Sequence, residues 1–305
     1  MCGLVGVHTL DGKFLTKVQK ELFEDLLKFN ITRGIDSVGV IFRQKETYSV
    51  VKTVGTTYDL VLNNQYKKEI AKDLVSLHGH NRAATVGGVN KNNAHPFEHG
   101  NTVGMHNGTL RNYCGEFSTD SEYIIHQLSN NEPKEVLEAL GGAYALTWVK
   151  DGQFYFARNS ERPLVCTIVE NLFIYASEEW MIKATLFKHE LSKNVKLRKI
   201  DTGKIFTINE GKIKIVSEFT PKPTFQETYW LYGGRSSYKQ TTPKNYNTPF
   251  NGPKGPCTLN YQDFVSKTVQ GCDCCGEKAS TLKAHLYTWI DDNSYYCDIC
   301  SLCAW

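Results

Sequence analysis

The stretch "MCGLVGVHTL", residues 1–10, places a cysteine directly behind the start methionine and follows it with apolar, β-prone residues. The apolar run predicts a buried strand at the beginning of the chain. A small second residue allows the start methionine to be removed, and removal gives Cys2 a free α-amine. The reference pKa of an α-amine is about 8, so this amine can take the proton of the adjacent thiol near neutral pH. The stretch alone leaves two interpretations open: a packing cysteine in a strand, or a nucleophile that carries its own base.

The residues that follow have the pattern of an amphipathic helix. Apolar side chains from Val18 to Phe29 recur at helical spacing, and Thr16 with Gln19 fits a capping box. Further helices are expected at about residues 66–75, 120–129, 133–140 and 178–187.

Apolar and β-branched runs separated by short turns predict strands in hairpin order. These strands are expected at residues 38–43, 47–54, 143–150, 153–158, 164–169, 172–177, 196–200, 204–208 and 212–216. Because strand pairs outnumber helices, we expect an α+β body with antiparallel sheets and helices grouped on their outer faces.

Composition limits the class of protein. The chain has 305 residues, of which 41% are apolar, so it can bury a sizeable core. Its net charge of +3 gives no general argument for nucleic-acid binding. No run approaches the roughly 18 apolar residues of a membrane span, and the N-terminus lacks the pattern of a secretory signal. We therefore expect a cytoplasmic protein.

The distribution of proline predicts the domain organisation. Six of the nine prolines lie between Pro221 and Pro256, in a stretch that is poor in aliphatic residues. Such a composition is typical of a linker or an extended arm. We expect a body at residues 2–218, a proline-rich linker or arm at 219–261 and a separate module at 262–305.

Two segments of the body carry residues suited to amide chemistry. "RAATVGG", residues 82–88, places an arginine before a loop of small residues, which suits a lid that holds a carboxylate. "HNGTLRN", residues 106–112, offers an asparagine amide beside a glycine N–H, the donors of an oxyanion hole. The alternative for Asn107-Gly108 is a two-residue hairpin turn, which is common for this dipeptide.

Nine short segments occur in the order in which class II glutamine amidotransferases carry them. They are Cys2-Gly3, "RGIDSVG" (33–39), "GHNRAAT" (79–85), "NAHPF" (93–97), "HNGTLRN" (106–112), "STDSE" (118–122), "GGAYAL" (141–146), "ARNSERPL" (157–164) and "ASEEWMI" (176–182). No single segment is specific for a family, but the nine segments in this order, beginning with an early cysteine, are specific. The body resembles the glutaminase domains of glucosamine-6-phosphate synthase and amidophosphoribosyltransferase over about residues 2–215. The resemblance implies a four-layer αββα sandwich of the N-terminal-nucleophile hydrolase type.

The resemblance also implies catalytic roles. Cys2 is the N-terminal nucleophile that attacks the side-chain amide of glutamine, and its α-amine is the general base. Asn107 and the backbone N–H of Gly108 stabilise the oxyanion. None of these steps needs a cofactor.

Glutamine is a zwitterion, so a site for the free amino acid needs a cation and an anion close together. The resemblance assigns Arg82, assisted by Thr85, to the α-carboxylate. It assigns Asp120, with the carbonyl of Gly108, to the α-ammonium. The supporting residues that it implies are Arg33 and Gly34 in the loop around the nucleophile, and His95 and His106 near the glutamine pocket.

The expected activity is hydrolysis of free L-glutamine to glutamate and ammonia through a thioester on Cys2. Only about 90 residues follow the body, and they contain no nucleotide-binding loop. We therefore expect the ammonia to pass to a separate synthetase or ligase subunit. Two alternatives remain open: an N-terminal-nucleophile hydrolase that acts on another amide, and an inactive scaffold of the same fold whose tail recruits a protein or nucleic acid.

The last 34 residues contain six of the ten cysteines. Cys272 with Cys275, and Cys297 with Cys300, form two CxxC pairs, and two such pairs supply the four thiolates of a tetrahedral structural zinc site. The alternatives are a reduced cysteine-rich strand pair or disulfides. We expect a zinc ribbon that binds a protein partner.

Overall fold

The computed structural model describes residues 2–111, 113, 115–193 and 195–223, together with two strands at 282–288 and 294–300. The chain divides into two compact units, 1–224 and 225–305, and each is described by itself. None of the helices in the described part of the chain combines the length and the apolar character needed to cross a membrane.

A seven-stranded antiparallel sheet contains the N-terminal strand. Its order is β11-β9-β10-β1-β4-β2-β3, so β1 lies centrally, between β10 and β4. The strands are β1 (Gly3–Thr9), β2 (Ser37–Arg43), β3 (Tyr48–Val54), β4 (Ser76–Arg82), β9 (Val165–Val169), β10 (Leu172–Ala176) and β11 (Arg198–Lys199). Gly3 lies opposite Asn81 of β4, and Val5 lies opposite Ala176 of β10. This register places the residue before β1 beside the end of β4 and beside the segment that follows β10.

A six-stranded antiparallel sheet forms the second layer, in the order β13-β12-β8-β7-β6-β5. The strands are β5 (Phe97–His99), β6 (Thr102–Leu110), β7 (Gly142–Lys150), β8 (Gln153–Arg158), β12 (Lys204–Asn209) and β13 (Lys212–Glu218).

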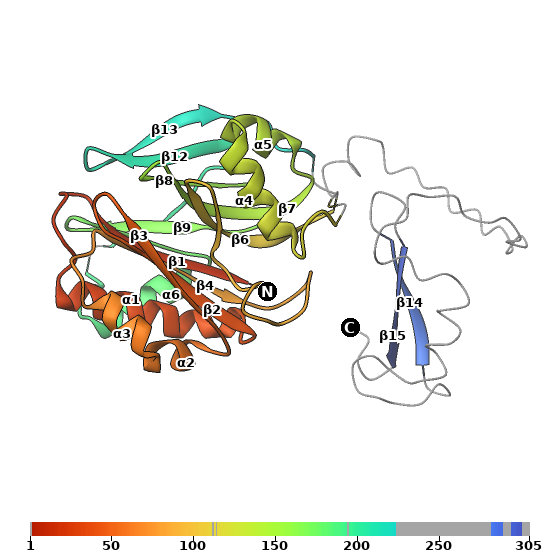
Figure 1. The fold of residues 1–305 in the computed structure, drawn as a ribbon, viewed down its shortest axis with the longest axis horizontal. Helices are drawn as coiled ribbons and strands as arrows, with labels where there is room; N and C mark the ends of the chain where they lie inside the picture. The colour runs from red at the N-terminus through yellow and green to blue at the C-terminus, as the bar shows by residue number, and fades with distance from the viewer. Residues whose placement is uncertain are drawn as a thin grey trace, which may run out of the picture. The chain divides into compact units, whose positions relative to one another are not determined.

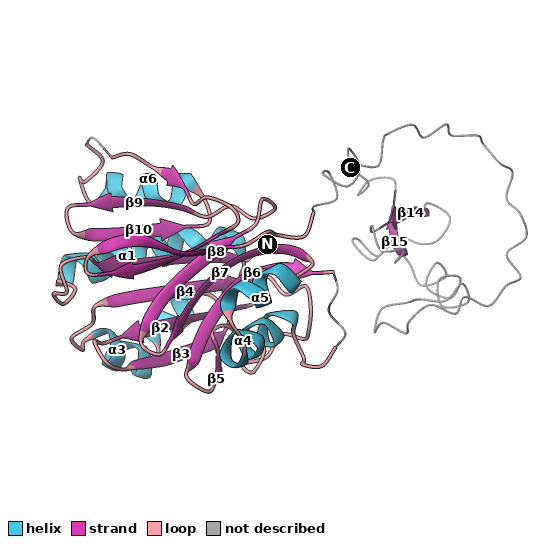
Figure 2. Cartoon of the chain, turned by 90° about the horizontal axis from the view of Figure 1, so that it is seen from above, coloured by secondary structure: helices cyan, strands magenta, loops and turns pink. Residues whose placement is uncertain are grey.

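Helices cover the outer faces of the two sheets (Figures 1 and 2). On the seven-stranded sheet lie α1 (Lys17–Phe29), the 3-10 helix at Asn30–Arg33, α2 (Thr57–Leu62), α3 (Asn64–Ile70) and α6 (Glu179–Lys188). On the six-stranded sheet lie α4 (Asp120–Asn130) and α5 (Pro133–Ala139). The layers therefore follow the order helix, sheet, sheet, helix.

Three apolar clusters fill the spaces between these layers. Val5 belongs to the cluster beneath α1, whereas its neighbour Leu4 belongs to the cluster between the sheets. The third cluster joins α4 and α5 to the six-stranded sheet and contains Trp148. Successive side chains of a strand point to opposite faces, and β1 is buried on both sides, which explains the apolar run over residues 3–7.

The predicted α+β class is confirmed, and α1 has the predicted capping box between Thr16 and Gln19. The helix predicted at residues 66–75 is too long, because α3 ends at Ile70. Beyond it, the carbonyl of Leu74 accepts from the N–H of Leu15, so the backbone pairs with another segment instead of continuing the helix. Several described elements, among them α2, β4 and β5, were not expected from the sequence.

The second unit contributes an antiparallel hairpin of β14 (Leu282–Thr288) and β15 (Ser294–Cys300). The predicted linker lies outside the described residues from position 224 onward, as do Cys272 and Cys275. Cys297 and Cys300 lie on β15, of which the backbone alone is described. The predicted zinc site and the domain boundaries stay predictions.

Candidate functional site

Cys2 is buried at the start of β1, with 9% of its surface exposed. Its thiol donates a hydrogen bond of 3.3 Å to the carbonyl of Ala83, the first residue after β4. Burial raises the pKa of the Cys2 thiol above its ordinary value. The positive charge of Arg82 lowers this pKa, and the negative charge of Asp120 raises it. The thiol is therefore protonated at neutral pH, and a base must take its proton before the sulfur can act as a nucleophile.

Asn107 and Gly108 lie inside β6, opposite Ala145 and Tyr144 of β7. The hairpin-turn alternative is therefore wrong for this dipeptide. A side chain at position 108 would bring its Cβ to 1.8 Å from the carbonyl oxygen of Ala143, so the close strand pairing requires glycine there. The buried side chain of Asn107 reaches the segment after β10, where its Nδ2 donates to Ser177 Oγ over 3.1 Å.

Arg82 ends β4, and only 3% of its surface is exposed. Its guanidinium donates to the carbonyls of Val86 (2.7 Å), Gly87 (3.2 Å) and Gly88 (3.2 Å). Arg82 thus organises the loop that follows it. Thr85 in this loop is exposed, and its hydroxyl lies 3.3 Å from that of Thr109.

The start of this loop is also fixed by residues 34–36. The amide N–H of Ala84 donates to Asp36 Oδ2 over 2.7 Å, and the amide N–H of Asp36 donates to the carbonyl of Arg82 over 3.0 Å. A Cβ on Gly34 would lie 2.2 Å from the carbonyl carbon of Arg82, so glycine allows this close approach. Asp36 lies in the segment "RGIDSVG" but was not among the residues predicted for the site.

Arg33 contacts the backbone of Cys2. Its Nε donates to the carbonyl oxygen of Cys2 over 3.1 Å, and its Nη1 pairs with Glu178 Oε1 at 2.8 Å. The predicted substrate-binding residue Arg33 therefore holds the residue before β1 and the segment after β10 together.

Asp120 is the first residue of α4 and is 3% exposed. Its Oδ2 accepts from the N–H of Leu110 over 2.8 Å, and its Oδ1 accepts from the N–H of Ser121 over 2.9 Å. Thr119 caps the helix by accepting from the N–H of Glu122. A carboxylate is favourable at a helix N-terminus, and both oxygens of Asp120 accept from backbone N–H groups.

His95 and His106 are buried neutral side chains. His95 stacks on His80 with 3.8 Å between ring centroids, and neither of its ring nitrogens has a hydrogen-bond partner among the described residues. Burial lowers the pKa of His95 well below its ordinary value, and burial likewise lowers the pKa of His106. Nδ1 of His106 lies 3.0 Å from Ser121 Oγ, next to Asp120. Both histidines lie in the interior around the candidate site without supplying charge to it.

Two residues of the segment after β10, Ser177 and Glu178, were not predicted from the sequence to belong to the site. Ser177 bonds Asn107 and Leu4, and Glu178 bonds Arg33. Both residues occur in the segment "ASEEWMI", whose place in the motif order was the available signal, although it gave no role for either residue.

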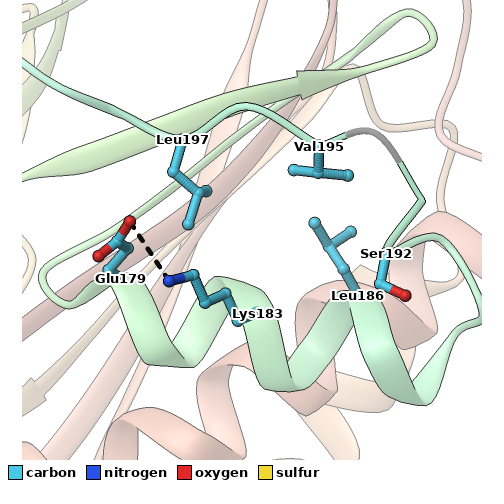
Figure 3. Close-up of a pocket in the computed structure, with 6 residues that line it drawn as sticks. All are labelled: Glu179, Lys183, Leu186, Ser192, Val195 and Leu197. Atoms are coloured by element: carbon cyan, nitrogen blue, oxygen red, sulfur yellow. Dashed lines mark ion pairs between the residues drawn. The ribbon is translucent and has the colours of Figure 1, made fainter.

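A cavity of about 420 Å³ opens on α6 and shares no lining residue with this site (Figure 3). Its lining consists of Glu179, Lys183, Leu186, Ser192, Val195 and Leu197. The ion pair between Glu179 and Lys183 spans 3.5 Å along the helix. None of the predicted site residues contributes to this cavity, so the candidate site rests on the side chains around Cys2.

Within residues 2–223, positions 112, 114 and 194 excepted, no group of three or more histidine, cysteine, aspartate or glutamate side chains is arranged to hold a metal ion. The four cysteines of the predicted zinc site belong to the other unit.

No family model matches the chain. A glutamine–fructose-6-phosphate aminotransferase (isomerizing) from Sulfurisphaera tokodaii is 31% identical over 203 residues, which cover 58% of this chain and 33% of that protein. The enzyme of the same name from Listeria innocua is 31% identical over 204 residues, covering 58% of this chain and 32% of that protein. The match thus spans about a third of the length of these relatives.

Among solved structures, glutamine phosphoribosylpyrophosphate amidotransferase from B. subtilis superposes with a TM-score of 0.55 at 19% identity, covering 72% of this chain and 49% of that one. A structure described as the allosteric regulatory enzyme of purine biosynthesis gives the same TM-score at 21% identity, with the same coverage. At this identity the likeness shows a shared fold.

Proposed function

We propose, from the relationship of this body to the class II glutamine amidotransferases, that the protein hydrolyses free L-glutamine to glutamate and ammonia. The observation that carries the proposal is the convergence of separate segments on one buried thiol. Cys2 contacts the residue after Arg82, lies within electrostatic reach of Arg82 and Asp120, and has its carbonyl held by Arg33. These are the residue types that a thioester mechanism on a zwitterionic substrate requires.

The reaction begins when the α-amine of Cys2, free once Met1 is removed, takes the thiol proton. The sulfur then attacks the side-chain amide carbon of glutamine, and the amide oxygen gains negative charge. The amine passes the proton to the departing nitrogen, ammonia leaves, and a thioester remains. Water next attacks the thioester, its proton returns through the amine to the sulfur, and glutamate is released.

Asn107 and Gly108 would stabilise the negative oxygen during both attacks. The amide of asparagine carries two N–H donors on Nδ2, and one of them is bonded to Ser177. The second can donate to the oxyanion together with the backbone N–H of Gly108. Removing one donor of this kind typically slows the chemical step by about 10²–10³.

Substrate selection would rest on Arg82 and Asp120. A guanidinium has five N–H donors, so its bonds to the loop carbonyls leave others for an α-carboxylate. Each carboxylate oxygen of Asp120 has a second lone pair beyond its bond to a backbone N–H, which can accept from an α-ammonium. Recognition of both charged groups selects free glutamine over glutamine within a peptide.

The experiment that tests this function uses protein in which mass spectrometry verifies Cys2 as the first residue. We expect release of glutamate and ammonia from glutamine, and one covalent adduct on Cys2 with diazo-oxonorleucine. A matched protein with a retained N-terminal extension lacks the free amine, so we expect it to be inactive. Absence of both hydrolysis and labelling in the processed protein contradicts the proposal.

We further propose that a separate synthetase or ligase receives the ammonia. Free ammonia is mostly protonated at neutral pH and is then a poor nucleophile, so direct delivery to a bound acceptor enzyme is the more effective arrangement. Glutamine labelled with nitrogen-15 in its amide tests this in the presence of the protein that co-purifies with the chain. We expect the label in an aminated product, whereas recovery of all label as ammonium indicates a plain glutaminase.

We also propose that Cys272, Cys275, Cys297 and Cys300 bind structural zinc in the C-terminal unit, and that this module contacts a protein partner. A four-thiolate site holds about one zinc ion per chain. Elemental analysis of the purified chain measures that ratio. The double variant Cys272→Ser with Cys275→Ser should lose the bound zinc. Cys166→Ser, which changes a buried cysteine of the body, should leave it intact. Zinc retained by the double variant contradicts the assignment.

A further inference from the structure

We infer that Ser177 is a positioning residue whose hydroxyl oxygen fixes the Asn107 amide relative to the nucleophile's strand. The inference rests on the proposed function and assigns a task to a residue outside the predicted site. Ser177 directly follows β10 and is fully buried.

Ser177 is tied to β1 through both its backbone and its side chain. Its N–H donates to the carbonyl of Leu4 over 2.8 Å, and its Oγ accepts from the N–H of Leu4 over 2.8 Å. Leu4 is two residues from Cys2 and is itself fully buried. The hydroxyl oxygen therefore holds a fixed place relative to the nucleophile.

The same oxygen accepts from Nδ2 of Asn107 over 3.1 Å. Among the described residues, Oδ1 of Asn107 has no hydrogen-bond partner, so the bond to Ser177 decides which way this amide faces. With one N–H held, the planar amide group sets the direction of the second N–H. Without the hydroxyl, the amide can turn over and present Oδ1, an acceptor that repels a developing oxyanion.

The neighbouring residue supports the same arrangement through a contact to the backbone of Cys2. Glu178 pairs with Arg33 at 2.8 Å, and Arg33 donates to the carbonyl of Cys2 over 3.1 Å. Residues 177 and 178 together hold Cys2, Leu4 and Asn107, which come from two different sheets.

The test compares Ser177→Ala with wild type in glutamine hydrolysis and in alkylation of Cys2 by iodoacetamide. Alkylation passes through no oxyanion, so it reports on the nucleophile alone. We expect kcat to fall by about 10- to 100-fold, somewhat less than the loss of an oxyanion donor itself. We expect KM and the alkylation rate to change by less than about threefold, within the ordinary effect of a small local shift. Ser177→Thr retains a hydroxyl and should restore part of kcat.

Two controls make the result specific. Ser76→Ala removes another fully buried hydroxyl of the same sheet, which bonds His78, and should leave kcat near that of wild type. In an Asn107→Ala background, Ser177→Ala should cost no further activity, because the two residues act as one unit.

A kcat for Ser177→Ala within about threefold of wild type overturns the inference, as do equal losses in hydrolysis and alkylation or additive effects with Asn107→Ala. Wild-type protein that is inactive although Cys2 is N-terminal and reacts with iodoacetamide contradicts the proposed function instead. The two failures are therefore distinguishable.

Discussion

The two sides of Cys2 are held in different ways. On one side, β1 and the segment after β10 are joined by bonds between buried groups, including those of Leu4 with Ser177. On the other side, the loop after β4 is largely exposed at residues 85 and 87–92, and Arg82 and Asp36 hold it at its base. The contrast indicates that the groups proposed to perform the chemistry are fixed, whereas the groups proposed to bind the substrate lie next to a segment with few tertiary restraints.

The largest expected effect comes from removing the fixed side's central group. Cys2→Ala should abolish glutamine hydrolysis, with a loss on the order of 10⁴-fold or more, as is typical when a covalent nucleophile is removed. Cys166→Ala removes a second buried cysteine of the same sheet and should retain activity. Assays of ammonia release by both variants, after verification of their N-termini, measure the difference. Substantial activity of Cys2→Ala indicates another nucleophile.

A change on the loop side should act mainly through substrate affinity. Arg82→Gln removes the charge assigned to the α-carboxylate and disturbs the bonds to the carbonyls of Val86 and Gly87. We expect kcat/KM to fall by about 100-fold, mostly through KM, because a charge-assisted bidentate contact contributes about 1.5–3 kcal/mol.

Limited proteolysis separates the two roles of Arg82. The loop should be cleaved faster in Arg82→Gln, because fewer hydrogen bonds hold it. In Asp36→Ala, which removes the acceptor for the N–H of Ala84, we expect faster cleavage with a smaller rise in KM. If Asp36→Ala raises KM as much as Arg82→Gln, the substrate-binding role of Arg82 is wrong, and its effect is on loop structure alone.

Elements that depend on local sequence patterns could be predicted, whereas those that depend on long-range contacts could not. The strand at β1 and the helix at α1 are local patterns of apolar residues and a capping box, so they were predicted. The polar sequence "SLHGHNR" of β4 does not look like a central strand. The strand can be buried because groups distant in sequence form hydrogen bonds with its polar side chains. His78 bonds Tyr175, and His80 bonds the carbonyl of His106.

Long-range contacts also account for the parts of the site that were not predicted. Asn107-Gly108 follows the local preference for a turn, but the close approach of Ala143 places it in a strand. Ser177 is hydrogen-bonded to Leu4, which is 173 positions away in the sequence, and no local sequence pattern predicts that bond. The order of the nine segments pointed to Arg33, Arg82 and Asp120, which lie near Cys2, whereas the bonds that position them required the fold.

The protonation of the thiol offers a test of the fixed side that needs no mutation of the site. Burial raises the pKa of Cys2, so at neutral pH the folded protein keeps the neutral thiol. In protein with a retained N-terminal extension, the α-amine is absent and iodoacetamide reports the thiolate alone. The alkylation rate should rise with pH at a higher midpoint in the folded protein than in the same protein in denaturant.

The raised pKa of the Cys2 thiol also determines how the stability of the folded protein changes with pH. A group whose pKa is raised by folding stabilises the folded state below its unfolded pKa, and this contribution is lost as pH rises through the folded pKa. The N-terminally extended protein should therefore lose stability in the alkaline range, above the ordinary thiol pKa, and Cys2→Ala should lose less. An alkylation midpoint that is lower in the folded protein than in the denatured chain contradicts the conclusion that burial raises the thiol pKa.

The smallest effect is expected where the fixed side is partly open to solvent. Glu178 has 32% of its side chain exposed, against 11% for its partner Arg33. Glu178→Gln keeps an acceptor for Arg33 but removes the charge, and a partly exposed ion pair contributes at most about 1 kcal/mol, so kcat/KM should fall by about two- to fivefold. The matched control is Glu122→Gln on α4. The Glu122 carboxylate lies 3.6 Å from His99 of β5, and this substitution should leave kcat/KM unchanged. High salt should narrow the gap between wild type and Glu178→Gln, because it screens the exposed pair but not the buried bonds of Ser177. A loss as large as that of Ser177→Ala would show that the Arg33 contact to Cys2, not the Asn107 amide, is the main restraint on this side.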